Sequence, residues 1–124
     1  MNLRTLLIDP HLITGNYIGP NLGLGYLVRA IEDYTSVEID QFSDVRISSC
    51  DTLDEFSDFE RDFLDRIVRR VAAEDYDVVG ITGTCNVYYR MVAIARAVKE
   101  VSPRTKVMYG GPHVTLMHQY APYR

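Results

Sequence analysis

The chain has 124 residues, of which 47% are hydrophobic, and it carries a formal net charge of −4 at pH 7. This length is that of one domain able to bury roughly two thirds of its unfolded surface, and the acidic balance argues against a nucleic-acid partner, whose binders concentrate Lys and Arg on one face. The sequence has no apolar run long enough to span a membrane and no signal-peptide layout after Met1, so we expect a cytoplasmic protein with no membrane partner. Its two cysteines, Cys50 and Cys85, are too few for a disulfide framework or a thiolate metal site, so we expect them to be reduced.

The first third of the chain predicts a strand, a helix and a second strand. The apolar run RTLLID at 4–9 predicts the first strand, and a loop punctuated by Gly and Pro follows it. A helix is expected over 20–33, because the fixed φ of Pro20 suits the first turn of a helix. The segment SVEIDQF at 36–42 alternates apolar and polar residues, as strands near the edge of a sheet do.

Residues 53–74 have the periodicity of a helix with one buried stripe. The stripe comprises Phe56, Phe59, Phe63, Leu64, Ile67, Val68 and Val71. The densest basic run of the chain, RIVRR at 66–70, lies in the same helix among acidic residues. We therefore expect this run to form a solvated face.

The last part of the chain predicts two more strands with a helix between them. The segment DVVGITG at 77–83 is nearly all apolar, which is typical of a central strand covered by helices on both faces. A helix over 87–101 is expected to end before Pro103. The segment TKVMYGG at 105–111 predicts a fourth strand that opens onto two glycines.

This alternation of strands and helices predicts an α/β fold, a doubly wound, Rossmann-like parallel sheet. In the flavodoxin-like order the first and third strands are neighbours and the fourth lies beside the third, with ligands bound beyond the carboxyl ends of the strands. Three loops then converge on one crevice: DPHLITG at 9–15, TGTCNVYY at 82–89 and GGPHVTL at 110–116. The glycine pair in the last loop either turns the chain or lets a ligand touch backbone.

Several common sites are excluded by missing residues. Val28 stands where the third glycine of a dinucleotide fingerprint would be, and no phosphate-binding GxxxxGK[ST] loop exists. A phosphoacceptor domain would need a second acidic residue beside Asp9, and the sequence has none there. Nucleophilic catalysis by Cys85 would need a base such as His11 or His113 brought to it by the fold, and a cysteine in such a loop is more often a small packing residue.

Three segments resemble a known family: LLIDP at 6–10, GPNLGLGYLVRAIED at 19–33, and the unit from DVVGITG at 77 to GGPHVTL ending at 116. They are similar to the cobalamin-binding domain of cobalamin-dependent radical S-adenosylmethionine enzymes. The resemblance covers nearly the whole chain and implies that cobalamin is the cofactor. The cofactor-binding residues that it implies are Asp9, Pro10, His11, Thr82, Gly83, Thr84, Cys85, Asn86, Val87, Gly110, Gly111, Pro112 and His113.

Such a loop set suits cobalamin because its nucleotide tail needs a slot bounded by backbone and small side chains. Glycines at 83, 110 and 111 would form the slot, and the hydroxyls of Thr82 and Thr84 would either bond the tail or cap the following helix. Val87, Tyr88 and Leu116 are expected at the edge of the corrin ring.

The loop after the first strand bears on cobalt ligation. In one branch of the superfamily an Asp-x-His-x-x-Gly loop supplies a histidine ligand to cobalt, oriented by the aspartate. Here Asp9 and His11 match that pattern, but Thr14 occupies the glycine position. The Asp-Pro pair is typical of the radical branch, in which no side chain binds cobalt from below. We therefore expect His11 to line the crevice without binding the metal, so that the chain supplies no metal ligand.

The chain departs from the family in two respects. A fifth strand is missing, so residues 1–124 are expected to form one cobalamin-binding domain truncated at its C-terminal end, with an open sheet edge that invites self-association. The CxxxCxxC motif is also absent. The domain is therefore not expected to be catalytic alone: S-adenosylmethionine and a 4Fe–4S cluster would belong to a radical S-adenosylmethionine domain, in cis or in trans, and the reaction would be methyl transfer or a related radical reaction.

Two other functions stay open. The chain could be a degenerate flavodoxin-like domain that binds no cofactor and acts as a protein-interaction module. A small-molecule enzyme acting at the same crevice is disfavoured, because no acid–base pair stands out in the sequence.

Overall fold

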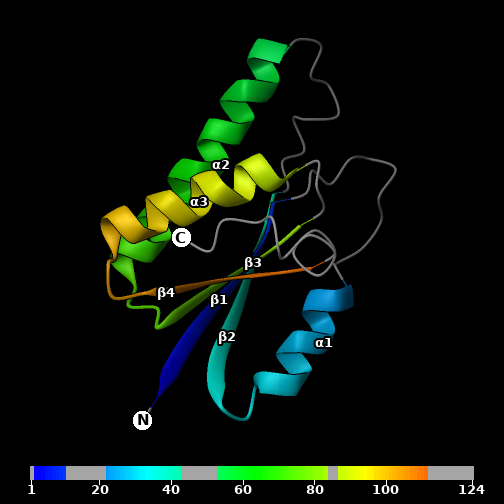
Figure 1. The fold of residues 1–124 in the computed structure, drawn as a ribbon, viewed down its shortest axis with the longest axis vertical. Coiled ribbons are helices and arrows are strands. Elements are labelled where there is room, and N and C mark those ends of the chain that lie inside the picture. Colours follow the sequence, from blue (N-terminus) through cyan, green and yellow to red (C-terminus); the bar gives the residue numbers. More distant parts are fainter. Residues whose placement is uncertain (1, 11–21, 43–52, 84–86, 112–124) are drawn as a thin grey trace, which may run out of the picture.

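The computed structural model describes residues 2–10, 22–42, 53–83 and 87–111. In chain order the elements are β1 (Leu3–Asp9), α1 (Leu22–Ile31), β2 (Thr35–Gln41), α2 (Leu53–Ala73), β3 (Val78–Thr82), α3 (Tyr88–Val101) and β4 (Lys106–Gly110) (Figure 1). The predicted elements are confirmed, with ends that differ from the expected ones by one or two residues.

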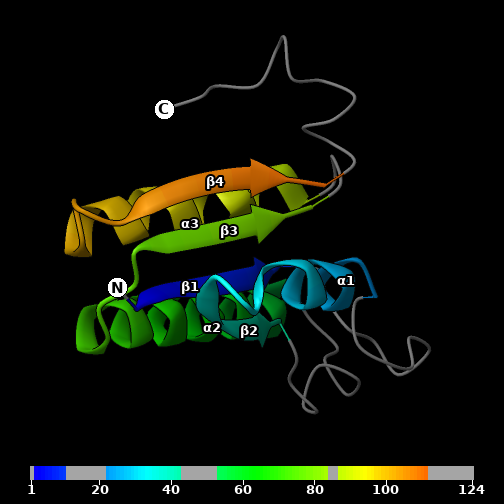
Figure 2. The same cartoon turned by 90° about the horizontal axis from the view of Figure 1, so that it is seen from below.

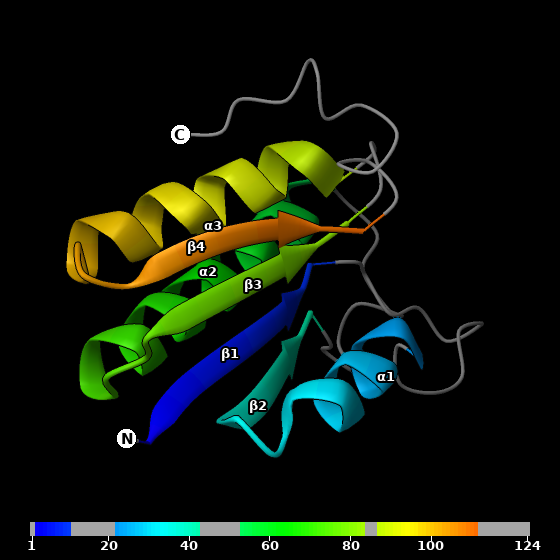
Figure 3. The ribbon, with the colours of Figure 1, turned by 60° about the horizontal axis from the view of Figure 1, so that its bottom comes forward.

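The strands form one parallel sheet in the order β2-β1-β3-β4, which confirms the flavodoxin-like α/β topology (Figure 3). The register aligns the carboxyl ends of neighbouring strands. Ile8 of β1 pairs with Asp40 of β2 on one side and with Ile81 of β3 on the other, and Thr82 pairs with Gly110 of β4. The loops that follow β1, β3 and β4 therefore begin at the same edge of the sheet.

Helices α2 and α3 pack against each other on one face of the sheet, and α1 lies on the opposite face (Figure 2). The core fills the space between the sheet and the α2–α3 pair. It contains Leu6 and Ile8 of β1, Phe42 after β2, Phe63, Ile67 and Val71 of α2, Tyr76, Val79 and Ile81 of β3 and the turn before it, and Met91, Ile94, Ala95 and Val98 of α3. Val68, expected in the stripe of α2, is half-buried and outside this cluster, and the side chain of Phe56 lies outside the described residues.

One expectation about β3 is wrong. Its Val79 and Ile81 are buried against the helices, but Val78, Gly80 and Thr82 on the other face are only half-buried. The reason is the position of α1, which contacts β2 at the edge of the sheet. Within the described part of the chain, the α1-side face of β3 and β4 is therefore not covered by a helix.

The basic run in α2 is not purely a solvated face either. Arg66 donates to one oxygen of Asp40 at 2.7 Å, and Arg70 donates to the other at 3.0 Å. Asp40 of β2 is only 8% exposed, and these two partners offset the cost of burying its carboxylate. Two arginines of the run thus fasten α2 to the edge of the sheet.

A second polar cluster lies near the amino end of β1. The hydroxyl of Tyr76 is 2.6 Å from Glu38 and 2.7 Å from Glu74, and Arg4 donates to Glu74 at 2.6 Å. Burial, together with hydrogen bonds to the two carboxylates, raises the pKa of Tyr76, so its hydroxyl stays protonated. Hydrogen bonds from Tyr76 and Arg4 lower the pKa of Glu74, so this carboxylate stays charged. The cluster joins β1, β2 and the turn after α2 at the end of the sheet opposite the predicted crevice.

Candidate functional site

The carboxyl edge of the sheet gathers the described members of the predicted site. Asp9 and Pro10 lie at the end of β1, Thr82 and Gly83 at the end of β3, and Gly110 and Gly111 at the end of β4. Asp9 is 5% exposed and its carbonyl accepts a hydrogen bond from the backbone N–H of Phe42 at 3.0 Å, so the end of β1 is held to the end of β2.

Of the other predicted site residues, Val87 is among those that the structure describes. His11, Thr84, Cys85, Asn86, Pro112 and His113 lie outside the described residues, as does Leu116. Among the residues that the structure does describe, no group of three or more His, Cys, Asp or Glu side chains could hold a metal ion.

The start of α3 packs closely on the end of β3. A Cβ atom added to Gly83 would lie 2.5 Å from the sulfur of Met91 and 2.8 Å from a methyl of Val87. Val87 is the N-cap residue of α3 and is 5% exposed, so it covers Gly83. Thr82 lies in β3 and does not cap this helix, so capping does not account for its hydroxyl.

The two glycines after β4 have different roles. Gly111 has a φ of 90°, and a Cβ atom there would lie 3.0 Å from the nitrogen of Gly83 and press on the Thr82 hydroxyl. Both the turn and the close approach to β3 therefore require glycine at 111. Gly110 has no such constraint, because a Cβ atom there would meet nothing within 4 Å. Its missing side chain leaves open space on the face of the sheet.

That open space belongs to an apolar trough between α1 and the uncovered face of the sheet. The trough has a volume of about 460 Å³. Its walls include Leu24, Leu27 and Ile31 of α1, and its floor includes Leu7 of β1, Gly80 of β3 and Met108 and Gly110 of β4. Among the described residues that line it, none is charged. A trough of this size and composition is typical of a site for an apolar ligand group.

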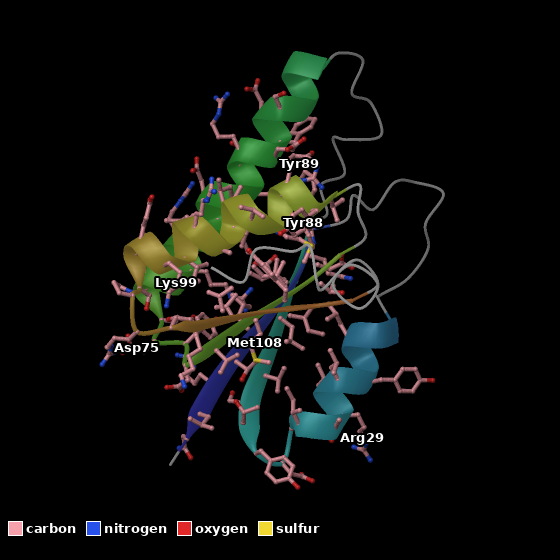
Figure 4. All side chains as sticks on the ribbon, viewed as in Figure 1. Arg29, Asp75, Tyr88, Tyr89, Lys99 and Met108 are labelled. Atoms are coloured by element: carbon pink, nitrogen blue, oxygen red, sulfur yellow. The ribbon has the colours of Figure 1, made fainter. Side chains whose placement is uncertain are left out.

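The rim of the trough is unusually apolar for a surface. Met108 on β4 is 61% exposed (Figure 4), Leu27 on α1 is 49% exposed, and Tyr34 after α1 is 78% exposed. Neighbouring apolar side chains that stay exposed mark surfaces that contact a ligand or another part of a protein.

The trough is the part of the site that the sequence did not predict. The signal for it was the presence of Gly80 inside a strand, since a strand glycine often marks a close approach of a ligand or another backbone. Leu7 and Met108 also alternate with the core residues along their strands, so their side chains point to the opposite face of the sheet. That α1 lies over this face could not be predicted without the strand order and the position of the helix.

Tyr88, expected at the ring edge, lies in the first turn of α3 beside Tyr89 (Figure 4). Its ring packs edge-on against Tyr109 with 6.3 Å between the ring centroids, and both side chains pack on the core. Its ring therefore contributes to the packing between α3 and β4.

Among the helices of the described residues, none combines the length and the hydrophobicity of a membrane-spanning segment.

Comparison with known proteins adds three findings. A sequence profile described as the B12 binding domain matches residues 9–122, which is most of the chain. An uncharacterized methyltransferase of Pyrococcus horikoshii is 33% identical over 100 residues, or 78% of this chain, and the match spans 18% of the length of that relative. No solved structure matches the chain.

Proposed function

This chain belongs to the B12 binding domain family, and we propose that it binds cobalamin at the carboxyl edge of its sheet. The observation that carries the proposal is the apolar trough, which runs along α1 and includes Gly110 and Gly111 at the end of β4. In this arrangement the trough would hold the nucleotide tail of the cofactor, and the residues at the ends of β1, β3 and β4 would face its corrin ring.

The described residues fit such a ligand. The flat base at the end of the tail is apolar on both faces, and the trough offers it leucine and isoleucine side chains on one side and strand backbone at Gly80 and Gly110 on the other. The absence of charge along the described lining avoids burying an unpaired ion beneath the ligand. The Thr82 hydroxyl, at the end of β3, is available to a polar group of the tail.

In this proposal the chain binds and orients the cofactor and supplies no reacting group of its own. Bound cobalamin supplies a cobalt centre able to carry a methyl group or to take part in radical chemistry. The described residues would exclude water from the tail and fix the direction in which the corrin faces a second domain. His11 would line the crevice without binding cobalt.

The first prediction tests cofactor binding directly. Purified protein mixed with hydroxocobalamin and then desalted is expected to retain a corrin absorption spectrum at close to one cofactor per chain. Circular dichroism of the same sample establishes that the protein is folded. A colourless eluate from folded protein would contradict cobalamin binding and favour the alternative function, a flavodoxin-like interaction module whose exposed apolar rim contacts another protein.

We further propose that the domain serves a radical S-adenosylmethionine enzyme that carries out methyl transfer or a related radical reaction. The proposal is supported by the similarity to an uncharacterized methyltransferase of which this chain spans 18%, and by the segments quoted above that resemble the cobalamin-dependent radical enzymes. The partner domain would hold S-adenosylmethionine and a 4Fe–4S cluster, because this chain has only two cysteines and such clusters need more thiolates.

The second prediction follows from that division of labour. Iron–sulfur reconstitution of this chain alone is expected to give no cluster absorbance, whereas a longer protein that includes the partner domain is expected to acquire a cluster and to cleave S-adenosylmethionine. A stoichiometric cluster on this chain alone, or a longer protein that acquires no cluster, would count against the assignment. Cobalamin binding by the isolated chain is measured separately. A failure of cobalamin binding can therefore be distinguished from a failure of the radical S-adenosylmethionine assignment.

A further inference from the structure

Arg90 is a buried cation next to the candidate site. It lies in the first turn of α3 and is 7% exposed. Within the described residues it is the only Lys or Arg that is buried. A guanidinium in such a place is costly unless its charge and its hydrogen-bond donors are matched. Its contacts therefore indicate what the residue does.

One part of the guanidinium holds the end of β1. Its NH1 group donates a hydrogen bond to the carbonyl oxygen of Pro10, a residue 80 positions earlier in the chain. The guanidinium carbon also lies 4.9 Å from the ring centroid of Phe42, the residue that follows β2. Arg90 thus contacts the first residue beyond each of two neighbouring strands.

The other part of the guanidinium is bound by side chains of the two helices. The NH2 group is 3.2 Å from the carboxylate of Glu60 in α2 and donates to the hydroxyl of Tyr89 at 2.8 Å. That hydroxyl is itself 3.1 Å from Glu60. The carboxylate balances the buried charge and also fixes the plane of the guanidinium, so the donor aimed at Pro10 is held in place.

The hydrogen bond to Pro10 lies just beyond the last backbone pair between β1 and β2. The ladder between β1 and β2 ends with the pair of Asp9 and Gln41, and Pro10 has no N–H with which to continue it. The Pro10 carbonyl is therefore the first backbone group that needs a partner outside the sheet, and Arg90 provides that partner. The next residue in the chain, His11, opens the loop expected at the corrin.

We propose that Arg90 is a positioning residue for Pro10, and that by holding the end of β1 beside the candidate site it strengthens cofactor binding. The inference deepens the proposed function and rests on it for the identity of the ligand. Arg90 itself does not need to touch cobalamin. A residue that only stabilised the fold could be bound to any carbonyl, whereas this one is bound at the exit to the candidate site.

The test compares Arg90→Met with Arg4→Met, which removes a guanidinium from the opposite end of β1. Arg4 binds Glu74 and Glu38 and lies outside the trough. Spectral titration with hydroxocobalamin is expected to show a Kd raised about tenfold or more in Arg90→Met, the size of effect expected when a hydrogen bond from a charged group is lost, and a Kd within about twofold of wild type in Arg4→Met. Equal Kd values for Arg90→Met and wild type would overturn the proposal, as would equal weakening by both variants.

A second measurement needs no cofactor and therefore separates this inference from the proposed function. The N–H of Phe42 bonds to the carbonyl of Asp9, and the N–H of Lys106 bonds to that of Asp77 at the other end of the sheet. Native-state hydrogen exchange of Arg90→Met is expected to accelerate at the Phe42 amide by about tenfold more than at the Lys106 amide. Uniform acceleration at both amides would mean that Arg90 supports the fold in general and would refute the positioning role. If wild type binds no cobalamin, the proposed function fails, and this exchange comparison still decides the role of Arg90.

Arg90→Lys covers the case in which Arg90→Met does not fold. Lysine keeps the charge that Glu60 requires, but a single ammonium cannot reproduce the planar fork that reaches Glu60 and Pro10 together. The melting temperature is therefore expected to recover more completely in Arg90→Lys than the Kd or the Phe42 exchange rate. Full recovery of all three quantities would show that only the charge matters and would overturn the positioning role.

Discussion

Gly110→Leu is expected to weaken hydroxocobalamin binding by about a hundredfold while changing the free energy of unfolding by less than about 0.5 kcal/mol. The side chain has room in the cofactor-free protein, because a Cβ atom at Gly110 meets nothing within 4 Å. The same side chain would then occupy the trough in which the tail is proposed to lie. Excluding an apolar ring system from such a site forfeits about 3 kcal/mol of burial, which corresponds to the predicted loss of affinity.

Gly25→Leu is the matched control for this substitution. A Cβ atom at Gly25 also meets nothing within 4 Å, but this residue lies on the exposed side of α1 and does not line the trough. Its Kd should equal that of wild type in the same spectral titration, and urea unfolding should show that both variants are folded. Unchanged affinity in Gly110→Leu would show that the trough is not where the tail lies, even if the chain binds cobalamin elsewhere.

Ile94→Ala is expected to lower the free energy of unfolding by about 2–5 kcal/mol, the range for removing a large aliphatic side chain from a packed core. Ile94 lies in the middle of α3, is fully buried, and belongs to the cluster between the sheet and the α2–α3 pair. Its truncation removes buried apolar surface and leaves a cavity. The surrounding side chains come from several elements and cannot shift far enough to fill it. Urea unfolding followed by circular dichroism measures the loss as a lower midpoint with an unchanged slope.

Val101→Ala in the same helix provides the comparison. Val101 is 40% exposed at the end of α3, so its truncation is expected to change stability by no more than about 0.5 kcal/mol. A similar large loss in both variants would mean that α3 is sensitive along its whole length. A small loss in Ile94→Ala would contradict the assignment of the core to the face of the sheet covered by α2 and α3.

These two predictions assign different roles to the two faces of one sheet. The face covered by α2 and α3 stabilises the fold, and it contains Leu6, Ile8, Val79 and Ile81. The opposite face of the same strands contains Leu7, Gly80, Met108 and Gly110, which line the trough. Because successive side chains of a strand point to opposite faces, a substitution at Val79 acts on stability, whereas one at Gly80 acts on the trough.

Local patterns in the sequence determined the elements and their order. Phe63, Ile67 and Val71 recur every four residues and therefore mark the inner face of α2 before any tertiary contact is known. Alternating strands and helices imply parallel pairing, and parallel pairing places the ends of β1, β3 and β4 at one edge. The described members of the predicted site were found at that edge because this reasoning uses only periodicity and chain direction.

Tertiary structure alone decided which residues meet across the chain. Gly110 and Gly111 are identical in the sequence, yet only Gly111 is pressed against β3, and only the packing around them reveals the difference. The inward ion pairs of Arg66 and Arg70 depend on where Asp40 lies in the sheet. Arg90 reaches Pro10 across 80 residues. Such contacts depend on the distances between packed elements, and side-chain periodicity along one segment contains no information about those distances.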